Sequence, residues 1–486
     1  MAYLKTRFYF NRLPIFFGLA FTFLLIFNYC TTEEDDNSNH EIIALNIETL
    51  GEGIVNSPNA PFVFGDEITL SAIPSEGYYF ERWEGLEQPI EDQELSFTLI
   101  QDIVITAVFL ALPELSEEIE IYNPKGIDPN PVFMIENGGT KAYLVSKTGQ
   151  IIQKWEFDAK LGNDLELFND GSIMGLFKPE QVSFSFGGYG GILKKYDSNG
   201  NLIFEYELNS ATELLHHDFE VLPNGNILLM VWEKFSSQDA KSMGYDKDGE
   251  TYLEKIIELN PTNKRIVWEW RSADHLIQDF NSEVSNYGQI SLSPQKIDLN
   301  YFNEENGDLM HANGIFYDSV NDVIYLSVNF YSEVWVIPHH YTTDETKTNL
   351  GDLKYRFGNP KAYGVNQERL FFNNHHPSLV TLDPKTEGRF LIYMNGSREQ
   401  QSIVYEFILP TYDSNPSIWT IPEVTWSFTN EELFFGKISG AYRLPNGNTL
   451  ICEGDYGYWE VNRLGEIVWK YNGRGEATFW RGYVYP

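Results

Sequence analysis

Leu222-Pro223-Asn224-Gly225-Asn226-Ile227-Leu228 and Leu444-Pro445-Asn446-Gly447-Asn448-Thr449-Leu450 share one pattern, a short turn between apolar segments. Asn-Gly between alternating apolar residues is a strong β-hairpin signal, because both turn residues tolerate a positive φ. A degenerate copy is Phe168-Asn169-Asp170-Gly171-Ser172-Ile173. The pattern indicates a fold made of repeated hairpins.

A second repeat is a turn followed by an alternating strand that ends in aromatic residues. It occurs at residues 199–206, 263–270 and 464–471, with a looser copy at 148–155. The chain also holds 34 Phe, 29 Tyr and 11 Trp, which favour strands over helices. The sequence therefore predicts an all-β fold with a β-propeller at residues 121–486, of about six blades at about 40–60 residues each. An array of β-sandwich domains is the alternative.

Residues 41–111 look like a separate small β domain. Residues 65–74 alternate apolar and polar positions, as expected of a half-buried strand, and residues 103–109 form a closing strand. The order of these segments resembles the bacterial B-repeat module found on surface proteins. That resemblance implies a spacer or adhesion role, and residues 112–120 are expected to be a linker.

The N-terminus has the pattern of an export signal. Lys5, Arg7 and Arg12 precede an apolar run at residues 13–27, which ends near Cys30. Residues 1–30 resemble a bacterial lipoprotein signal peptide, which implies lipidation of Cys30 and attachment to an envelope membrane. The outer membrane is expected, with the chain facing the periplasm or the cell surface. An uncleaved N-terminal anchor is the alternative.

Residues 31–40 are polar and acidic, so they are expected to form a flexible tether. This run resembles a surface-export signal of Bacteroidetes-like lipoproteins, and a plain solvated linker remains open. The formal net charge of -36 disfavours nucleic acid as a partner. With only Cys30 and Cys452 present, the sequence predicts no disulfide framework, and Cys452 is expected to be an inert core residue.

Five of the nine histidines lie in three similar places, each before a strand-like run: His216 and His217, His311, and His375 and His376. In a closed all-β structure, these strand entries would converge at one end. The alternative is that each histidine is a satisfied polar residue at a strand end. Zinc or copper binding by the histidines and Asp218 is a rival hypothesis, but no metal-binding spacing supports it, so no metal and no cofactor is predicted.

A longer series of motifs follows in fixed order from about Gly139 to Tyr471. It consists of His216-His217-Asp218 before the first Asn-Gly turn, His311-Ala312-Asn313 before residues 317–328, then residues 355–360, 371–375 and 439–454. The series resembles the bacterial arylsulfotransferases, which do not use the nucleotide donor PAPS. The resemblance implies a six-bladed propeller whose central channel moves a sulfuryl group from an aryl sulfate donor to a phenolic acceptor.

By that resemblance, His375 matches the nucleophile, which becomes sulfated. His311 and His217, or its neighbour His216, match further catalytic or substrate-binding histidines. Asp218 could fix the tautomer of His217, and His376 could orient His375 or point away.

The chain also departs from the family pattern. A sulfate-binding arginine is replaced by Asn329, for which Arg356 or Arg398 could substitute, and a glutamine before the nucleophile is replaced by Asn374. Arginine offers a charged bidentate fork that asparagine lacks. A non-catalytic propeller that binds a ligand in its channel is therefore the alternative function. Asn395-Gly396-Ser397 also satisfies a glycosylation pattern.

We predict that Cys30 is the lipidated first residue of the mature chain, because the basic and apolar segment ends there. One acyl chain binds a membrane weakly, so several are expected. Mass spectrometry of the mature N-terminus measures this directly. An intact Met1, or cleavage at another residue, would contradict the prediction.

Overall fold

The computed structural model describes residues 41–380, 388–396, 401–409, 422–475 and 478–485. The predicted signal, the tether, Cys30 and Arg398 lie outside these residues. Strands account for 49% of the described residues and helices for 6%, which confirms the all-β prediction. The chain divides into two compact units, one up to Leu110 and one from Ala111 onward. No helix in the described ranges is long and apolar enough to cross a membrane.

The first unit contains three small sheets, ordered β2-β8-β6, β3-β5-β7 and β1-β4. Its strands are β1 (Ile42–Ile43), β2 (Leu45–Leu50), β3 (Gly53–Asn56), β4 (Phe62–Val63), β5 (Glu67–Pro74), β6 (Tyr78–Glu84), β7 (Glu94–Thr98) and β8 (Ile103–Ala111). The inward residues of β5, including Ile68 and Leu70, are buried with Trp83 and Phe109. The alternation predicted for residues 65–74 is confirmed by this burial.

The described part of the second unit holds six larger antiparallel sheets. The first joins β12 (Ile151–Glu156), β11 (Lys141–Val145), β10 (Val132–Glu136) and β35 (Phe479–Val484). The second joins β13 (Leu161–Leu167), β14 (Ile173–Phe177), β15 (Ile192–Tyr196) and β16 (Leu202–Glu207). The third joins β17 (Glu213–Val221), β18 (Ile227–Phe235), β19 (Thr251–Asn260) and β20 (Arg265–Arg271).

The other three sheets repeat this order. The fourth joins β23 (Ala312–Asp318), β24 (Val323–Val328), β25 (Glu333–Pro338) and β26 (Tyr355–Phe357). The fifth joins β27 (Asn374–Val380), β28 (Arg389–Met394), β29 (Ile403–Ile408) and β30 (Glu423–Phe428). The sixth joins β31 (Gly440–Arg443), β32 (Thr449–Glu453), β33 (Gly457–Val461), β34 (Ile467–Asn472) and β9 (Ile119–Tyr122).

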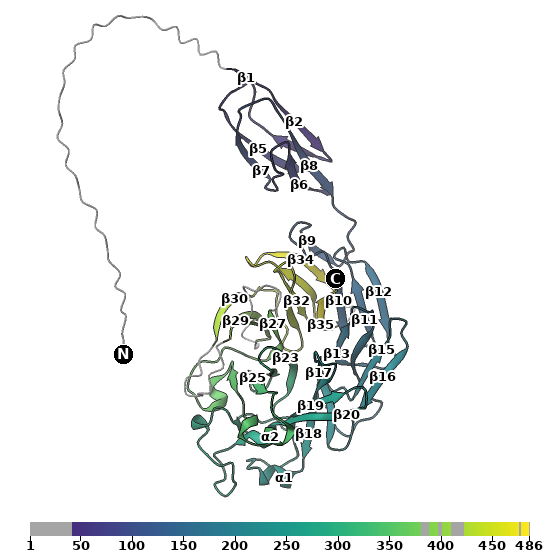
Figure 1. The fold of residues 1–486 in the computed structure, drawn as a ribbon, viewed down its shortest axis with the longest axis vertical. Helices are drawn as coiled ribbons and strands as arrows, with labels where there is room; N and C mark the ends of the chain where they lie inside the picture. The colour runs from purple at the N-terminus through teal and green to yellow at the C-terminus, as the bar shows by residue number, and fades with distance from the viewer. Residues whose placement is uncertain (1–40, 381–387, 397–400, 410–421, 476–477, 486) are drawn as a thin grey trace, which may run out of the picture. The chain divides into compact units, whose positions relative to one another are not determined.

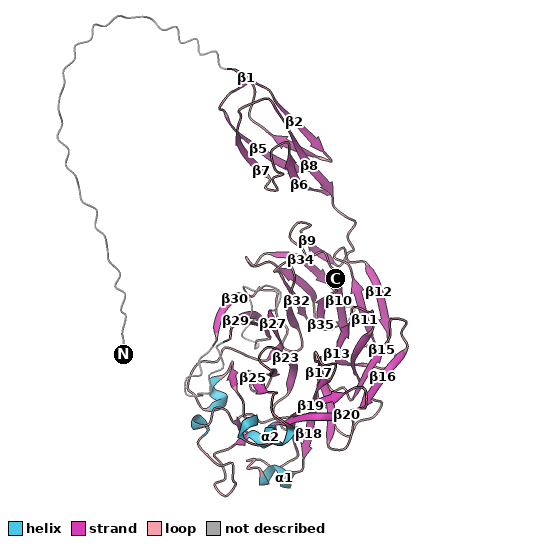
Figure 2. Cartoon of the chain, in the orientation of Figure 1, coloured by secondary structure: helices cyan, strands magenta, loops and turns pink. Residues whose placement is uncertain are grey.

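Short helices and one parallel strand pair lie in the segments between these sheets. Figure 2 shows the helices near β18 and β25. They are α1 (Ser237–Ser242), α2 (Thr343–Thr346) and the 3-10 helices η1 (Ser272–His275), η2 (Ile290–Leu292), η3 (Asn349–Gly351) and η4 (Pro360–Tyr363). The strand pair is β21 (Leu276–Ile277) with β22 (Ile297–Asp298).

Six strands, one from each large sheet, pack side by side. We call β13, β17, β23, β27, β31 and β35 the inner strands. Each contacts the next in this order, and β35 contacts β13. The C-terminal strand β35 pairs with β10 near the start of the unit, so the two ends of the unit share one sheet (Figure 1). This arrangement brings residues that are distant in sequence to a common centre.

The two sequence repeats occupy different parts of the sheets. The Asn-Gly turns link an inner strand to its neighbour, as predicted, but only the glycines, Gly225 at φ 82° and Gly447 at φ 91°, have a positive φ. The aromatic-ended repeat forms β12, β16, β20 and β34, the fourth strand counted from the inner strand. The two patterns therefore marked the inner hairpin and the fourth strand of a recurring sheet.

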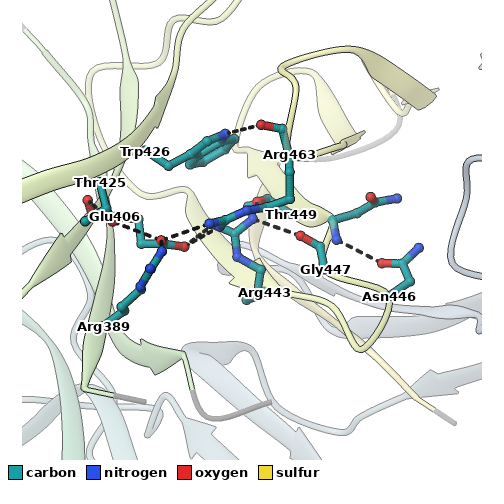
Figure 3. Close-up of polar contacts among 10 residues, drawn as sticks. Arg389, Glu406, Thr425, Trp426, Arg443, Asn446, Gly447, Thr449 and Arg463 are labelled. Carbon is teal, nitrogen blue, oxygen red and sulfur yellow. Dashed lines mark hydrogen bonds and ion pairs between the residues drawn. The ribbon is translucent and has the colours of Figure 1, made fainter. Parts of the chain in front are cut away.

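A buried carboxylate ties the fifth sheet to the sixth (Figure 3). Glu406 is fully buried, and its carboxylate accepts hydrogen bonds from Arg389 at 2.8 Å, Arg443 at 2.5 Å and Arg463 at 2.6 Å. Burial alone would raise the pKa of Glu406, but the three guanidinium groups hold it at about 2. The guanidinium of Arg443 also lies 4.7 Å from the Trp426 ring centroid.

We predict that Glu406→Gln destabilises the protein by about 3–5 kcal/mol, because it leaves the buried Arg443 without a counter-ion. The depressed pKa implies that this contribution is present at neutral pH and is lost as the pH falls toward 2. Urea unfolding at pH 7 measures the change. The exposed Glu431 provides a control, since Glu431→Gln should stay within about 0.5 kcal/mol. Equal effects of the two substitutions would refute this role for Glu406.

Candidate functional site

Irregularities at the start of three inner strands position the histidines. The pairing register shifts between Leu215 and Phe219 on β17, and between His375 and Ser378 on β27. His217 has φ 55° and His311, just before β23, has φ 49°. Such left-handed positions cost about 1–3 kcal/mol for a non-glycine residue and are concentrated at functional sites. The histidines thus lie on or beside the inner strands, which begin earlier than the sequence pattern suggested.

The structure brings His217, His311 and His375 together. The ring centroids of His217 and His311 are 4.8 Å apart. The rings of His217 and His375 both contact Trp480 of β35, at 6.0 Å and 6.2 Å. Three inner strands and the residue just before a fourth therefore contribute to one cluster, which we call the histidine site.

Asn395 fixes the orientation of the His375 ring. The Asn395 side-chain nitrogen donates to the carbonyl oxygens of Phe435 and Ile438, both at 2.8 Å. Its Oδ1 must therefore accept a hydrogen bond, and it lies 2.6 Å from Nδ1 of His375. That contact places the proton on Nδ1 and leaves the lone pair on Nε2. Burial lowers the pKa of His375 to about 3, so the ring is neutral at pH 7.

The pKa of His311 is shifted in the opposite direction. Burial alone would lower the pKa of His311, but Asp308 raises it above its ordinary value through a contact of 2.5 Å between Oδ2 and Nδ1. The His311 ring also stacks on Phe330, with the centroids 4.8 Å apart. The histidine site therefore combines a neutral histidine with one that favours the imidazolium form.

His217 rather than His216 faces the other histidines. His216 is fully buried and stacks on Trp232 at 4.0 Å, and its Nε2 lies 3.0 Å from Glu254 without hydrogen-bond geometry. The Nδ1 atoms of the two histidines are 2.9 Å apart. Burial lowers the pKa of both rings, to about 3 for His216. His216 therefore contacts His217 but does not face His311 or His375.

A glycine-rich loop between β14 and β15 covers His217. Gly188 has φ 79°, and a Cβ built on it would lie only 2.0 Å from Nε2 of His217. The backbone N–H of His217 also donates to the Gly188 carbonyl at 2.8 Å. No motif in the sequence analysis included this loop, although Gly187-Gly188-Tyr189-Gly190-Gly191 was a visible signal.

Aromatic rings line the loops beside the histidine site. Phe186 contacts Trp232 at 5.1 Å and Tyr252 at 4.8 Å, and Phe184 contacts Tyr252 at 4.8 Å. Such rings present flat apolar faces that favour offset or edge contacts with a further aromatic ring. The surroundings of the histidines thus suit an aryl ligand.

Several sequence-predicted residues have structural partners instead. Arg356 is buried against Glu333, with its Nε 3.0 Å from the carboxylate, and also donates to the carbonyl of Lys296. The structure therefore does not bring Arg356 to the histidines. Asn374 is fully buried and donates to Ser327 at 2.8 Å and to the Glu333 carbonyl at 3.0 Å. Its side chain therefore links β27 to β24 and β25 and does not face the histidines.

Asn329 is buried, and its amide nitrogen is 3.4 Å from the carbonyl oxygen of Asn374.

The sequence suggested that Asp218 orients His217, but the structure does not place it there. The Asp218 carboxylate accepts hydrogen bonds from Arg481 at 2.8 Å and from the Ile315 N–H at 2.9 Å. His376, at φ 53°, turns toward Tyr483.

Other sequence observations have simple outcomes. Cys452 is buried and free, in line with a core role. Asn395 is fully buried, so the glycosylation pattern at this residue coincides with an orienting side chain. Within the described ranges, no group of three or more His, Cys, Asp or Glu residues could hold a metal ion.

Two family models match the chain. One, described as arylsulfotransferase (ASST), matches residues 125–459, and the other, described as a divergent InlB B-repeat domain, matches residues 43–113. No curated protein matches significantly. Both predicted resemblances are confirmed by the family models.

Solved structures show weaker similarity. A Bacteroides caccae protein of unknown function has 12% identity and a TM-score of 0.43, covering 73% of this chain and 98% of its own. A putative 6-phosphogluconolactonase from Bacteroides fragilis has 10% identity and a TM-score of 0.39, covering 74% and 99%. The β-propeller domain of Cps50 (Swd1) from Myceliophteria thermophila has 11% identity and a TM-score of 0.34, covering 77% and 88%.

We predict that Asp308→Asn lowers the pKa of His311, because burial is then opposed only by the weaker fields of Glu254 and Glu304. Histidine-selective NMR titration of the whole protein measures this pKa. Asp322, which lies 2.8 Å from His339, provides a matched control, and Asp322→Asn should leave the His311 resonance unchanged. An unaltered His311 pKa in Asp308→Asn would show that Asp308 does not set the charge.

Proposed function

The chain belongs to the arylsulfotransferase family, and we propose that it transfers a sulfuryl group from an aryl sulfate to a phenolic acceptor through a sulfated His375. The observation that carries the proposal is the fixed orientation of His375. Asn395 holds Nδ1, so the free lone pair of a neutral imidazole is on Nε2. A neutral imidazole held in place is a competent nucleophile.

In the first step, Nε2 of His375 attacks the sulfur atom of the donor. An N–S bond forms and the S–O bond to the aryl group breaks. The departing aryl oxygen takes a proton from the His311 imidazolium and leaves as a phenol. This step converts His375 into a sulfohistidine and leaves His311 neutral.

In the second step, the acceptor phenol occupies the place of the departed phenol. Its oxygen attacks the sulfur while His311 takes its proton, and the N–S bond breaks. The product is a new aryl sulfate, and both histidines return to their initial states. One acid–base residue serves both steps because the protonation state that ends the first begins the second.

His311 also supplies positive charge that Asn329 lacks. Transfer of a sulfuryl group, like that of a phosphoryl group, is helped by donors and cations around its equatorial oxygens. The His311 imidazolium, supported by Asp308, is the cation of the histidine site. We infer that it takes over part of the role of the family arginine, with His217 positioning the His311 ring.

The architecture and location form part of the proposal. The order of the inner strands supports a six-bladed propeller, with the histidine site in its central channel. The domain bounds proposed are 41–111 for the B-repeat-like module and 121–486 for the propeller. Cys30 would hold the chain at an envelope membrane.

A channel that only binds a ligand is the second candidate. The uncharged Asn329 at the arginine position favours it, because a binding site needs no clamp on a transferring group. The sulfotransferase candidate predicts catalytic turnover, and the binding candidate does not.

We predict that the protein releases p-nitrophenol from p-nitrophenyl sulfate when a phenol is added, and that His375→Ala abolishes this turnover. Removal of a nucleophile typically costs several orders of magnitude in rate. His340 is an exposed histidine, so His340→Ala is the matched control and should retain full activity. Circular dichroism checks that both variants fold. Absence of phenol-dependent turnover in the unmodified protein, tested with several aryl sulfates, would favour the binding function.

A further inference from the structure

Neighbouring sheets of the second unit are linked by the same arrangement of side chains at three places. A buried glutamate on the third strand, counted from the inner strand, faces a cation that follows the third strand of the next sheet. We call each such contact a joint, and Figure 3 shows the one between sheets five and six. The pairs are Glu258 of β19 with His339 after β25, Glu406 of β29 with Arg463 after β33, and Glu460 of β33 with Lys147 after β11.

A tryptophan on the fourth strand completes each joint. Its ring centroid lies 4.7 Å from the ring of His339 for Trp268, 6.0 Å from the guanidinium of Arg463 for Trp426, and 4.6 Å from the ammonium of Lys147 for Trp469. Each indole N–H also donates to a backbone carbonyl at or near the cation, which belongs to Tyr341, Arg463 and Lys147, respectively. The three joints are therefore equivalent positions of a repeated sheet.

The joint between sheets three and four differs from the other two in the nature of its cation. A guanidinium and an ammonium serve the other joints, and their ordinary pKa values lie far above neutral pH. An imidazole ordinarily titrates at about pH 6.5. His339 is therefore the cation that can lose its charge near physiological pH.

Both ring nitrogens of His339 face carboxylates. Nε2 lies 3.1 Å from Oε2 of Glu258, and Nδ1 lies 2.8 Å from Oδ1 of Asp322, in the turn between β23 and β24. The other oxygen of Glu258 accepts a hydrogen bond at 2.5 Å from Asn226, in the Asn-Gly turn of sheet three. An imidazolium donates to both carboxylates, whereas a neutral imidazole has a single N–H and can donate to only one. The charged ring therefore ties a hairpin turn of sheet three to one of sheet four.

The surroundings of His339 favour the charged ring. Burial alone would lower the pKa of His339, but Glu258 and Asp322 raise it above its ordinary value. Burial alone would raise the pKa of either carboxylate, but hydrogen bonds from His339 help to keep both below their ordinary values. Two other titratable groups act on Asp322: the Tyr317 hydroxyl of β23 donates to it at 2.8 Å, and His340 lowers its pKa through its field.

We propose that His339 makes the joint between sheets three and four sensitive to pH, with the imidazolium holding the sheets together and the neutral ring releasing them. Because the pKa of His339 is raised, the link is present below the ordinary histidine pKa and is lost as the pH rises through the raised value. The same two sheets carry His217 and, just before β23, His311. The joint does not depend on sulfuryl transfer at the histidine site.

Hydrogen exchange of the whole protein, followed by mass spectrometry, tests the proposal. Between about pH 6 and about pH 9, exchange of the β19 and β25 amides, corrected for the intrinsic rate, should rise about tenfold, because a hydrogen bond between charged groups is lost. Amides of β29, at the joint that Arg463 closes, provide the internal control and should show no such rise. An equal rise at both joints, or no rise at either, would overturn the proposal.

Variants assign the effect to His339. His339→Arg introduces the permanent charge found at Arg463 and should abolish the pH dependence, whereas His339→Gln should exchange as fast at about pH 6 as the unmodified protein does at about pH 9. The exposed His340 provides a matched control, and His340→Gln should keep the original pH dependence. Unchanged pH dependence in both His339 variants would contradict the assignment. Histidine NMR titration of the unmodified protein needs no variant, and a His339 pKa at or below the ordinary value would also contradict it.

Discussion

The buried guanidinium of Arg481 holds the centre of the second unit together. It pairs with Asp218 of β17, donates to the Asn313 carbonyl at 3.0 Å on β23, and lies 3.7 Å from Asp164 of β13. The C-terminal strand β35 is thereby tied to three other inner strands. A buried charge costs several kcal/mol unless its partners satisfy it, so these contacts also fix the relative positions of the strands.

The histidine site borders this centre. On β35, Trp480 contacts the rings of His217 and His375, while its neighbour Arg481 pairs with Asp218. The positive charge of Arg481 helps burial to keep His375 neutral. The pKa of His311 is raised instead, because the Asp308 carboxylate lies beside it. One set of strands therefore holds a neutral histidine and a histidine with a raised pKa in one cluster, as the proposed two-step transfer requires.

The sequence carried the local features of this arrangement but not its long-range contacts. The Asn-Gly turns were predictable because the positive φ of Gly225 and Gly447 is a local requirement. His375, His311 and His217 were found by their motifs. Asn395 was recognised only as a glycosylation pattern, because its link to His375 spans 20 residues and depends on the pairing of β27 with β28.

Arg481 and Gly188 were missed for related reasons. Arg481 lies beyond the motif series, and its partner Asp218 is 263 residues away. Gly188 became informative only when a Cβ at this position was seen to collide with His217. Conversely, Arg356 was a reasonable substitute for the missing arginine by residue type. Its ion pair with Glu333 depends on how the strands of the fourth sheet pair, which the sequence alone does not show.

The central claim is that Nε2 of His375 carries the sulfuryl group between donor and acceptor. The most direct test is peptide mass spectrometry after the protein has been incubated with an aryl sulfate and no acceptor. The account predicts one sulfuryl group on the peptide that contains His375, which disappears when a phenol is added. A sulfuryl group on another residue, or turnover without any modified peptide, would contradict it.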